Sequence, residues 1–246
     1  MHLSHKNILE MPQESHLQLS ISGRKITIGL FIACILMLCL NLIGIYFKLY
    51  LGENWFWSNA VYFFFDASRE GSFQTIFSTL LLITAAIIVG LIGLMLHRKH
   101  PTRKYWFVLG ILFSFLALDE SLTIHEQFNK LRPVVNDQSG FFYYSWIIPY
   151  LGLVILVGLF FFRFLFLLPP DIRNLFIISG VIYVGGAIGF EALEGYVVSH
   201  GGPESLSDKL LCAVEEFLEM SGITLFIYAT LKHIKSLQKE IEVGFG

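Results

Sequence analysis

Residues 116–126 read LALDESLTIHE, and they place three carboxylates and one imidazole within an apolar run that extends over about 105–129. A run of this length can cross the hydrocarbon core of a bilayer, about 30 Å thick, as a helix that rises about 1.5 Å per residue. Ionisable side chains are costly inside lipid, and a membrane-embedded group of them indicates a functional site. The stretch therefore predicts a transmembrane helix with a polar site in its second half.

The chain contains six apolar runs of this kind, and they decide the fold class. Backbone groups that face lipid must be hydrogen-bonded within their own segment, and these lengths suit helices rather than barrel strands. Composition agrees, since only 15% of the 246 residues are charged, compared with about 25% in soluble domains. We therefore predict an all-α fold, a polytopic membrane helix bundle with about six transmembrane helices. The predicted helices cover about 26–49, 73–97, 105–129, 142–168, 173–199 and 206–234.

The remaining segments are short. A polar N-terminal tail at 1–25 precedes a single transmembrane domain at 26–235, and a C-terminal tail follows at 236–246. The formal net charge of −2 gives no reason to expect nucleic acid as a partner. The three cysteines all lie in apolar runs, so a disulfide framework is not expected.

Basic residues indicate which side of the membrane each loop occupies. The densest basic patch is HRKHPTRK at 97–104, between the second and third apolar runs. Arg24 and Lys25 near the N-terminus, and Lys232 and Lys235 near the C-terminus, fall on the same side as this patch if the chain crosses six times. Because short cytoplasmic loops are enriched in Lys and Arg, we expect both termini in the cytoplasm and the protein in a plasma membrane, which in a bacterium is the inner membrane.

The first outer loop has an apolar stretch of its own. Residues 54–66 read NWFWSNAVYFFFD, which is too short to span the membrane and too apolar for a free loop. We interpret it as an interfacial or re-entrant segment that covers the outer mouth, and a partly buried packing loop is the alternative. Trp106 and Trp146 fall near the ends of apolar runs, a position typical of side chains at the headgroup level.

Acidic residues recur at a similar depth on three predicted helices. Asp119 lies about 21 Å above the inner end of its helix, and Glu191 lies about 24 Å above Leu175. On the last helix, which runs inward, Glu215 and Glu219 lie about 14–20 Å below the outer boundary. The layer contains His125 and these carboxylates: Asp119, Glu120, Glu126, Glu191, Glu194, Glu215, Glu216 and Glu219.

Each predicted helix presents its acids on one face. Asp119, Thr123 and Glu126 share a stripe if their helix continues to its predicted end. The two other helices pair their acids at i, i+3 and i, i+4, which are neighbouring positions. On the fifth helix, Gly185 and Gly189 have the GxxxG spacing that lets helices approach closely in lipid.

The layer has far more acidic than basic groups. His125 is its only basic residue, and no Lys or Arg occurs at this depth. Ionised carboxylates in a low-dielectric interior require protons or bound cations as compensation. A carboxylate-rich site with one imidazole suits Fe, Mn, Ca or Mg, and suits Zn less well. We therefore predict a divalent metal site with His125 and Glu120 as catalytic groups and with these ligands: Asp119, Glu120, His125, Glu126, Glu191, Glu194, Glu215 and Glu219.

Catalytic motifs do not narrow the reaction. Neither HExxH nor GxSxG occurs, and the Glu-x-x-His pair of ferritin-like di-iron proteins is absent as well. A metal centre would support hydrolysis or oxidation of a lipid-like substrate. We expect such a substrate to enter through an outer opening lined by Tyr143, Tyr144 and Tyr150, with membrane lipid as the surrounding partner.

Two other functions are compatible with the sequence. Intramembrane acids also mark proton and cation pathways, so the first alternative is a proton or divalent-cation transporter. The second is a non-catalytic membrane subunit or sensor whose acids dock the cations of another protein. Taken singly, Glu126 and Glu194 could also be ordinary groups at a wet outer surface. Between the acidic layer and the inner side of the membrane, the helices carry only scattered hydroxyl groups, those of Thr84, Ser114, Ser179 and Thr224. This favours a site that is open to one side of the membrane over a path through it.

Overall fold

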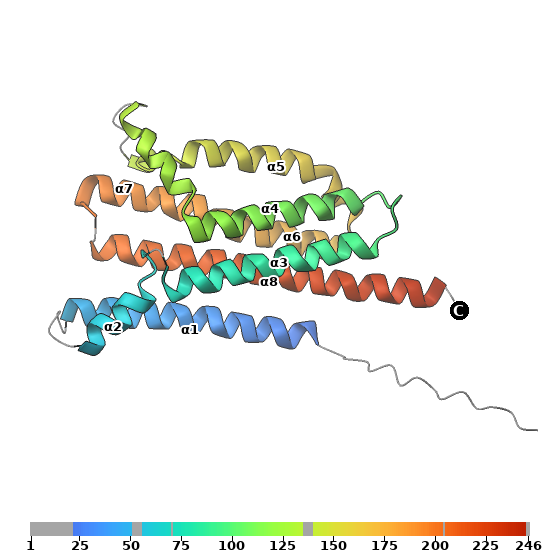
Figure 1. The fold of residues 1–246 in the computed structure, drawn as a ribbon, viewed down its shortest axis with the longest axis horizontal. Helices are drawn as coiled ribbons and strands as arrows, with labels where there is room; N and C mark the ends of the chain where they lie inside the picture. The colour runs from blue at the N-terminus through green and yellow to red at the C-terminus, as the bar shows by residue number, and fades with distance from the viewer. Residues whose placement is uncertain (1–21, 51–55, 70, 135–139, 204, 245–246) are drawn as a thin grey trace, which may run out of the picture.

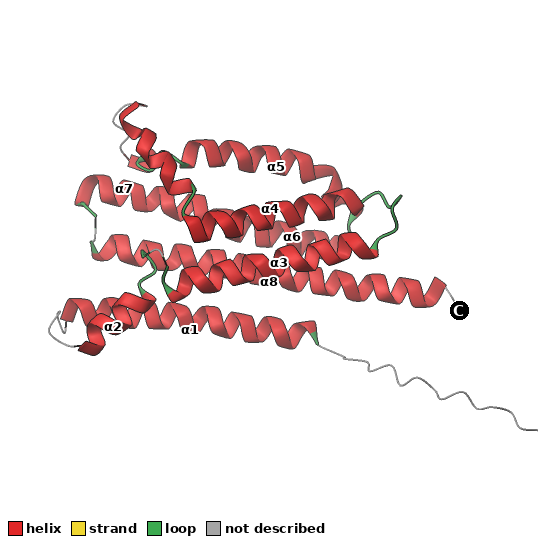
Figure 2. Ribbon diagram, in the orientation of Figure 1, coloured by secondary structure: helices red, strands yellow, loops and turns green. Residues whose placement is uncertain are grey.

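The computed structural model describes residues 22–50, 56–69, 71–134, 140–203 and 205–244. Its long helices run side by side and form one bundle (Figure 1), and no strand occurs within these ranges (Figure 2). The predicted all-α class is therefore confirmed. The α-helices are α1 (Gly23–Tyr50), α2 (Phe56–Phe65), α3 (Phe73–Met95), α4 (Arg103–Leu122), α5 (Ile147–Leu167), α6 (Pro170–Val184), α7 (Glu191–Gly201) and α8 (Leu206–Gly244). The 3₁₀ helices η1 (His125–Val134) and η2 (Gly140–Phe142) and the π-helix η3 (Gly185–Phe190) complete the described structure.

Five helical stretches in the described ranges are long and apolar enough to cross a membrane. Four are the single helices α1, α3, α4 and α5, and the fifth is the continuous stretch of α6, η3 and α7. Large apolar side chains on their outer surfaces are exposed, for example Ile111 at 70% and Leu159 at 69%. Such a surface is unfavourable in water, so the five helices are compatible with an integral membrane protein.

The remaining long helix, α8, lies in the centre of the bundle (Figure 1). It packs against α1, α3, α6, η3 and α7, and most of its side chains between 219 and 230 are buried on all sides. A helix surrounded by protein can keep acidic side chains that lipid would exclude, which explains the mixed composition of α8. The start of α1 and the last turns of α8 lie at the same end of the bundle (Figure 1), where Gly23 lies against Leu231.

Aromatic packing closes this end of the bundle. The ring of Trp106 stacks on His233 of α8 and meets Phe164 of α5 edge-on, with 5.2 Å between ring centroids in both pairs. The indole N–H donates a hydrogen bond to the Thr102 hydroxyl at 3.3 Å. Trp106 and Trp146 are only 0% and 5% exposed and pack inside the protein. Their position at the depth of the headgroups stays a prediction.

The third predicted helix ends earlier than the apolar run suggested. α4 stops at Leu122, and Thr123 adopts the left-handed conformation (φ 48°, ψ 46°) that commonly terminates a helix. The Asp119 carboxylate accepts the backbone N–H of His125 at 2.8 Å, which turns the chain out of the helix. The predicted helix to residue 129 is therefore wrong. The stripe shared by Asp119, Thr123 and Glu126 is wrong for the same reason, because Glu126 belongs to η1.

The fifth predicted helix, 173–199, is not one regular α-helix. The π-helix η3 interrupts it, and π-helical turns often occur at functional sites. The predicted packing role of Gly185 and Gly189 is wrong, because a Cβ atom at either position would have no atom within 4 Å. The two glycines of the GxxxG pair therefore border open space and do not pack against another helix.

Two other glycines bring this segment and α8 into contact. A Cβ atom at Gly186 would lie 2.9 Å from the carbonyl oxygen of Glu215. One at Gly222 would lie 2.8 Å from the backbone nitrogen of Tyr183. The backbones of the two helices thus approach as closely as small residues permit.

The outer segment predicted at 54–66 forms the short helix α2, and its residues 54 and 55 lie outside the described ranges. α2 packs against the end of α1, where Asn41 Nδ2 donates a hydrogen bond to the Phe65 carbonyl at 2.7 Å. Its position at the membrane interface stays a prediction. Most of the predicted N-terminal tail also lies outside the described ranges, whereas the C-terminal tail is helical as far as Gly244.

Replacing Gly222 with alanine should separate α6 from α8. The new Cβ would lie 2.8 Å from the Tyr183 nitrogen and 3.0 Å from the Ser179 carbonyl oxygen, and neither backbone atom can rotate away. We expect the free energy of unfolding in detergent to fall by about 1–3 kcal/mol, as in other overpacked cores. Gly90→Ala is the matched control, because nothing lies within 4 Å of its Cβ position and alanine favours a helix by up to about 1 kcal/mol over glycine. Equal stability of the two variants would contradict the prediction.

Candidate functional site

A cavity of about 830 Å³ lies between α4, α5, α6, η3 and α8. Most of its wall is apolar and is formed by side chains such as Leu112, Val157 and Phe226. Ligand-binding cavities typically have volumes of about 300–1,000 Å³, so this one is large enough for a sizeable ligand. Its titratable and polar lining residues are Asp119, Glu120, His125, Trp146, Tyr150, Ser179, Tyr183, Glu215, Glu216 and Glu219.

Two contacts connect α4 and α5, one at each end of the cavity. At one end of the cavity the Tyr150 hydroxyl donates a hydrogen bond to Asp119 Oδ1 at 2.9 Å. At the other end the ring of Tyr105 stacks on Phe164, with 5.2 Å between the ring centroids. Side chains of both helices between these two contacts line the cavity. The acidic residues and the apolar side chains therefore line one continuous cavity.

Asp119 and His125 form a pair at the polar end of the cavity. Asp119 is only 6% exposed, and its Oδ2 lies 3.3 Å from His125 Nδ1. Burial lowers the pKa of His125, but the hydrogen bond to Asp119 and the charges of Asp119, Glu191 and Glu126 together raise it above its ordinary value. The geometry therefore favours an imidazolium held by a carboxylate.

The segment that precedes α5 orients the carboxylates of α7. The indole N–H of Trp146 donates to Glu191 Oε1 at 3.1 Å, and its ring lies 4.9 Å from the ring of His125. The Tyr144 hydroxyl donates to Glu194 Oε1 at 3.1 Å. Burial and the nearby Glu194 charge raise the pKa of Tyr144, so the hydroxyl keeps its proton and remains a donor.

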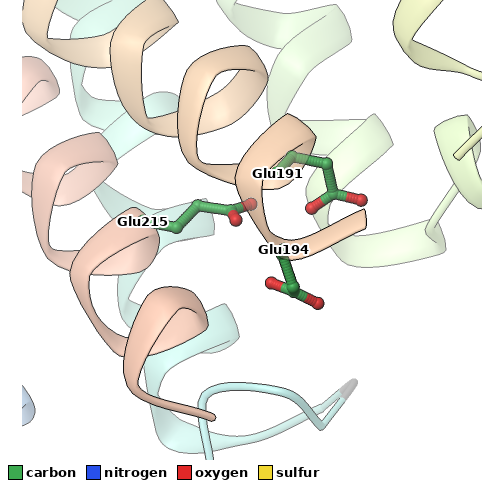
Figure 3. Close-up of side chains that lie close together, drawn as sticks. All are labelled: Glu191, Glu194 and Glu215. Carbon is green, nitrogen blue, oxygen red and sulfur yellow. The ribbon is translucent and has the colours of Figure 1, made fainter. Parts of the chain in front are cut away.

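Glu191, Glu194 and Glu215 form a three-carboxylate group, in which one oxygen of each lies within 4.8 Å of the others. Figure 3 shows Glu215 extending from α8 toward α7, where Glu191 and Glu194 lie about one helical turn apart. The glycine contact at Gly186 makes this possible, because a Cβ there would meet the Glu215 backbone. Glu215 is 8% exposed, and its Oε2 has no hydrogen-bond partner within the described part of the chain. Such a set of oxygens suits a hard cation.

Two more predicted site residues, Glu120 and Glu219, line the cavity, and so does Glu216, which the sequence placed in the acidic layer but not among the metal ligands. Glu219 is 9% exposed and follows Glu215 by one helical turn. Glu216 Oε2 is buried and has no hydrogen-bond partner among the described residues. The cavity and the three-carboxylate group, which share Glu215, therefore contain all but one of the carboxylates that the sequence placed in the layer.

Glu126 is the exception. It is exposed on η1, and it belongs neither to the cavity lining nor to the three-carboxylate group. Its charge still helps to raise the pKa of His125. Of the three tyrosines expected at an outer opening, Tyr150 lines the cavity.

The sequence did not reveal a buried lysine close to the acidic layer. Lys209 Nζ lies 3.8 Å from Asp66 Oδ2 and 5.1 Å from the centre of the Tyr62 ring. The side chains of Lys209 and Asp66 are 8% and 4% exposed. Lys209 follows closely on the start of its helix and therefore resembles an interfacial residue, and no pattern in the sequence pairs it with Asp66. The hydrogen bonds that Trp146 and Tyr144 donate to Glu191 and Glu194 were not predicted from the sequence either. Aromatic residues just before a helix are a sequence signal that could have indicated such donors.

Comparison with known proteins gives a match to a family model alone. No curated protein and no solved structure matches the chain. A family model matches residues 29–234, which extend from α1 into α8 and include every candidate site residue described above. Because the match covers most of the sequence, the chain belongs to the family described as Domain of unknown function (DUF8692).

Proposed function

We propose that this protein is a membrane-embedded enzyme in which carboxylates hold a divalent cation beside a cavity for a lipid-like substrate. The observation that carries the proposal is the position of Glu215, which belongs both to the three-carboxylate group and to the cavity wall. A ligand in the cavity would therefore lie next to an ion held by Glu191, Glu194 and Glu215. The Glu215 Oε2 atom supports the same reading, because it is buried, has no hydrogen-bond partner among the described residues and is therefore available to a cation.

The ligand set indicates the kind of ion. Oxygen ligands suit Fe, Mn, Ca and Mg better than Zn. When bound, such an ion would act as a Lewis acid or lower the pKa of a water molecule, and iron would add oxidation chemistry. Glu219 lies one turn from Glu215 on α8 and offers a further carboxylate for the same ion or a second one. A ligand role for Glu126 would require movement of η1.

His125 is the residue best placed to move a proton. It lines the cavity, and Asp119 holds its Nδ1 side at 3.3 Å, as carboxylates orient catalytic histidines and stabilise their protonated form in other enzymes. Glu120 is adjacent to Asp119 on the same wall and is the second acid–base candidate. The apolar remainder of the wall would exclude bulk water and strengthen these electrostatic interactions.

Metal content tests the centre. Protein purified in detergent, incubated with Mn²⁺ or Fe²⁺ and dialysed should retain at least one ion per chain. The double variant Glu191→Gln with Glu215→Gln should lose that ion, because two of three charged ligands become neutral amides. Elemental mass spectrometry measures the difference.

Asp171→Asn is the matched control for this experiment. The Asp171 carboxylate is exposed on α6 and pairs with Lys232 at 2.7 Å, away from the three-carboxylate group. Its removal should leave the metal content unchanged. A wild-type protein that stays metal-free with every ion tested would refute the centre.

Transport of cations or protons is the alternative that the acidic layer leaves open. Three of the four hydroxyl groups on the inner side of the acidic layer donate hydrogen bonds to backbone carbonyls of their own helix. These bonds run from Ser114 to Gly110 at 2.8 Å, from Thr84 to Leu80 at 2.7 Å and from Ser179 to Phe176 at 2.9 Å. Along α8, the buried apolar side chains of Met220, Ile223 and Ile227 follow the acids. These features favour a site open to one side over a path through the bundle.

Liposome flux measurements discriminate between the two functions. Proteoliposomes should move Mn²⁺ and protons no faster than empty liposomes, because the side chains around α8 in the inner half of the bundle are mostly apolar. A flux that Glu191→Gln abolishes would instead establish transport.

We further propose that the chain crosses the membrane six times, with α8 as the sixth span and both termini in the cytoplasm. The 39 residues of α8 are ample for a crossing. Support for the orientation comes from basic residues that are exposed in the connection between α3 and α4 (Arg98 and Lys99) and near the end of α8 (Lys232 and Lys235). This connection and the last turns of α8 lie toward the same end of the bundle as the start of α1 (Figure 1). Cytoplasmic loops are enriched in such residues.

Cysteine labelling tests this topology. In a chain whose native cysteines are replaced, Gly201→Cys should react with a membrane-impermeant maleimide added to intact cells, and Arg98→Cys should react only after the cells are opened. Both positions are exposed, so accessibility to the reagent reports the side of the membrane. The reverse pattern would invert the proposed orientation, and labelling of both positions in intact cells would exclude an odd number of crossings between them.

A further inference from the structure

The cavity reaches the lipid-facing surface of the bundle between α5 and α6. The backbone of α5 packs mainly against α6, and its long outer surface is exposed. Two residues of α6, Ile177 and Val181, belong to the cavity wall and are nevertheless 45% and 67% exposed. Both side chains are apolar, so this opening suits a hydrocarbon chain that enters sideways from the membrane.

The depth of the cavity is close to that of one leaflet. On α4 the lining extends from Leu109 to Glu120, and on α8 from Glu215 to Phe226, which is about 17 Å in each case at 1.5 Å per residue. The hydrocarbon core of a bilayer is about 30 Å thick. α4 and α8 run in opposite directions, so both place their acids at the same end of the cavity and their apolar residues at the other.

The charge at the polar end decides which head group fits. Five carboxylates and one imidazole line the cavity, and a divalent ion on the neighbouring group would offset only part of this negative charge. Lys209, a buried lysine near the acidic layer, pairs with Asp66. A phosphate would therefore meet like charges in a poorly solvated site, which is unfavourable, whereas an ammonium group would form charge-assisted hydrogen bonds with carboxylates.

We propose that the cavity binds a single-chain lipid amine, with its hydrocarbon chain between α5 and α6 and its ammonium group at Glu216 and Glu219. The proposal rests on the proposed function only in treating this lipid as the substrate, since lipid binding itself requires no metal. The site therefore selects an amine and rejects a phosphate on a chain of the same length.

Glycines in the wall provide a way to fill the cavity without disturbing the bundle. Gly158 of α5 and Gly180 of α6 line the cavity, and a Cβ at either position would have no atom within 4 Å. A leucine at these positions would occupy space that the lipid chain needs. Gly152 of α5 is equally unhindered and is not part of the lining, which makes Gly152→Leu a matched control.

Photo-crosslinking in nanodiscs tests the proposal. The probes are octadecylamine and octadecyl phosphate that carry the same diazirine on the chain, and mass spectrometry of peptides locates the labelled residues. We expect the amine to label the cavity walls of α5, α6 and α8 at least tenfold more than the phosphate, in line with the cost of like charges. Gly158→Leu with Gly180→Leu should remove this labelling, and Gly152→Leu should retain it.

A second variant tests the head group independently of cavity volume. Glu216→Gln with Glu219→Gln should reduce the preference for the amine while the chain still enters the cavity. Equal labelling by the two probes in the wild type, or labelling confined to the outer surface, would overturn the proposal. Metal content measured on the same samples separates the two ideas: a metal-loaded protein without amine labelling retains the proposed centre and loses the lipid amine, and amine labelling of a metal-free protein does the reverse.

Discussion

The close approach of the α6–η3 segment to α8 is the constraint on which the site depends. At Gly186 and Gly222 the two backbones meet at distances that leave no room for a Cβ atom, and this contact lets Glu215 reach the carboxylates of α7. Burial of like charges at such short range is unfavourable. The packing of two helices and the need for protons or a cation are therefore consequences of the same contact.

The central position of α8 explains how a bundle with so many apolar helices keeps so many acids. Apolar helices surround α8 on most sides, so the side chains of Glu215 and Glu219 avoid lipid and meet other protein groups. A cavity lies between α8 and α5, and the contacts of Tyr150 with Asp119 and of Tyr105 with Phe164 connect α5 to α4 at its two ends. The acids and the cavity coincide because the polar face of α8 is directed into that space.

Much of the fold could be predicted from the sequence, and the failures have specific causes. Apolar runs predicted the long helices, but the run containing Asp119 continued past the true helix end, because a side-chain hydrogen bond to the His125 backbone and a left-handed Thr123 terminate α4. An assignment based on hydropathy cannot detect either event. The error displaced Glu126 from the face it was assigned to, while Glu191 and Glu194 remained neighbours despite the π-helix that precedes them.

The sequence by itself determined the all-helical class, the presence of several apolar helices compatible with a membrane and the excess of carboxylates on three segments, because lipid and backbone hydrogen bonding act on each segment separately. It predicted six such helices, and five of the described stretches are long and apolar enough to cross a membrane. Only the tertiary structure decided which acids meet, which aromatic donors hold Glu191 and Glu194, and that Lys209 pairs with Asp66. These contacts depend on how far apart two helices lie and how each is rotated about its axis. Those quantities are fixed by packing between segments that are distant in the sequence, and at this site by two glycines whose spacing carries no recognisable motif.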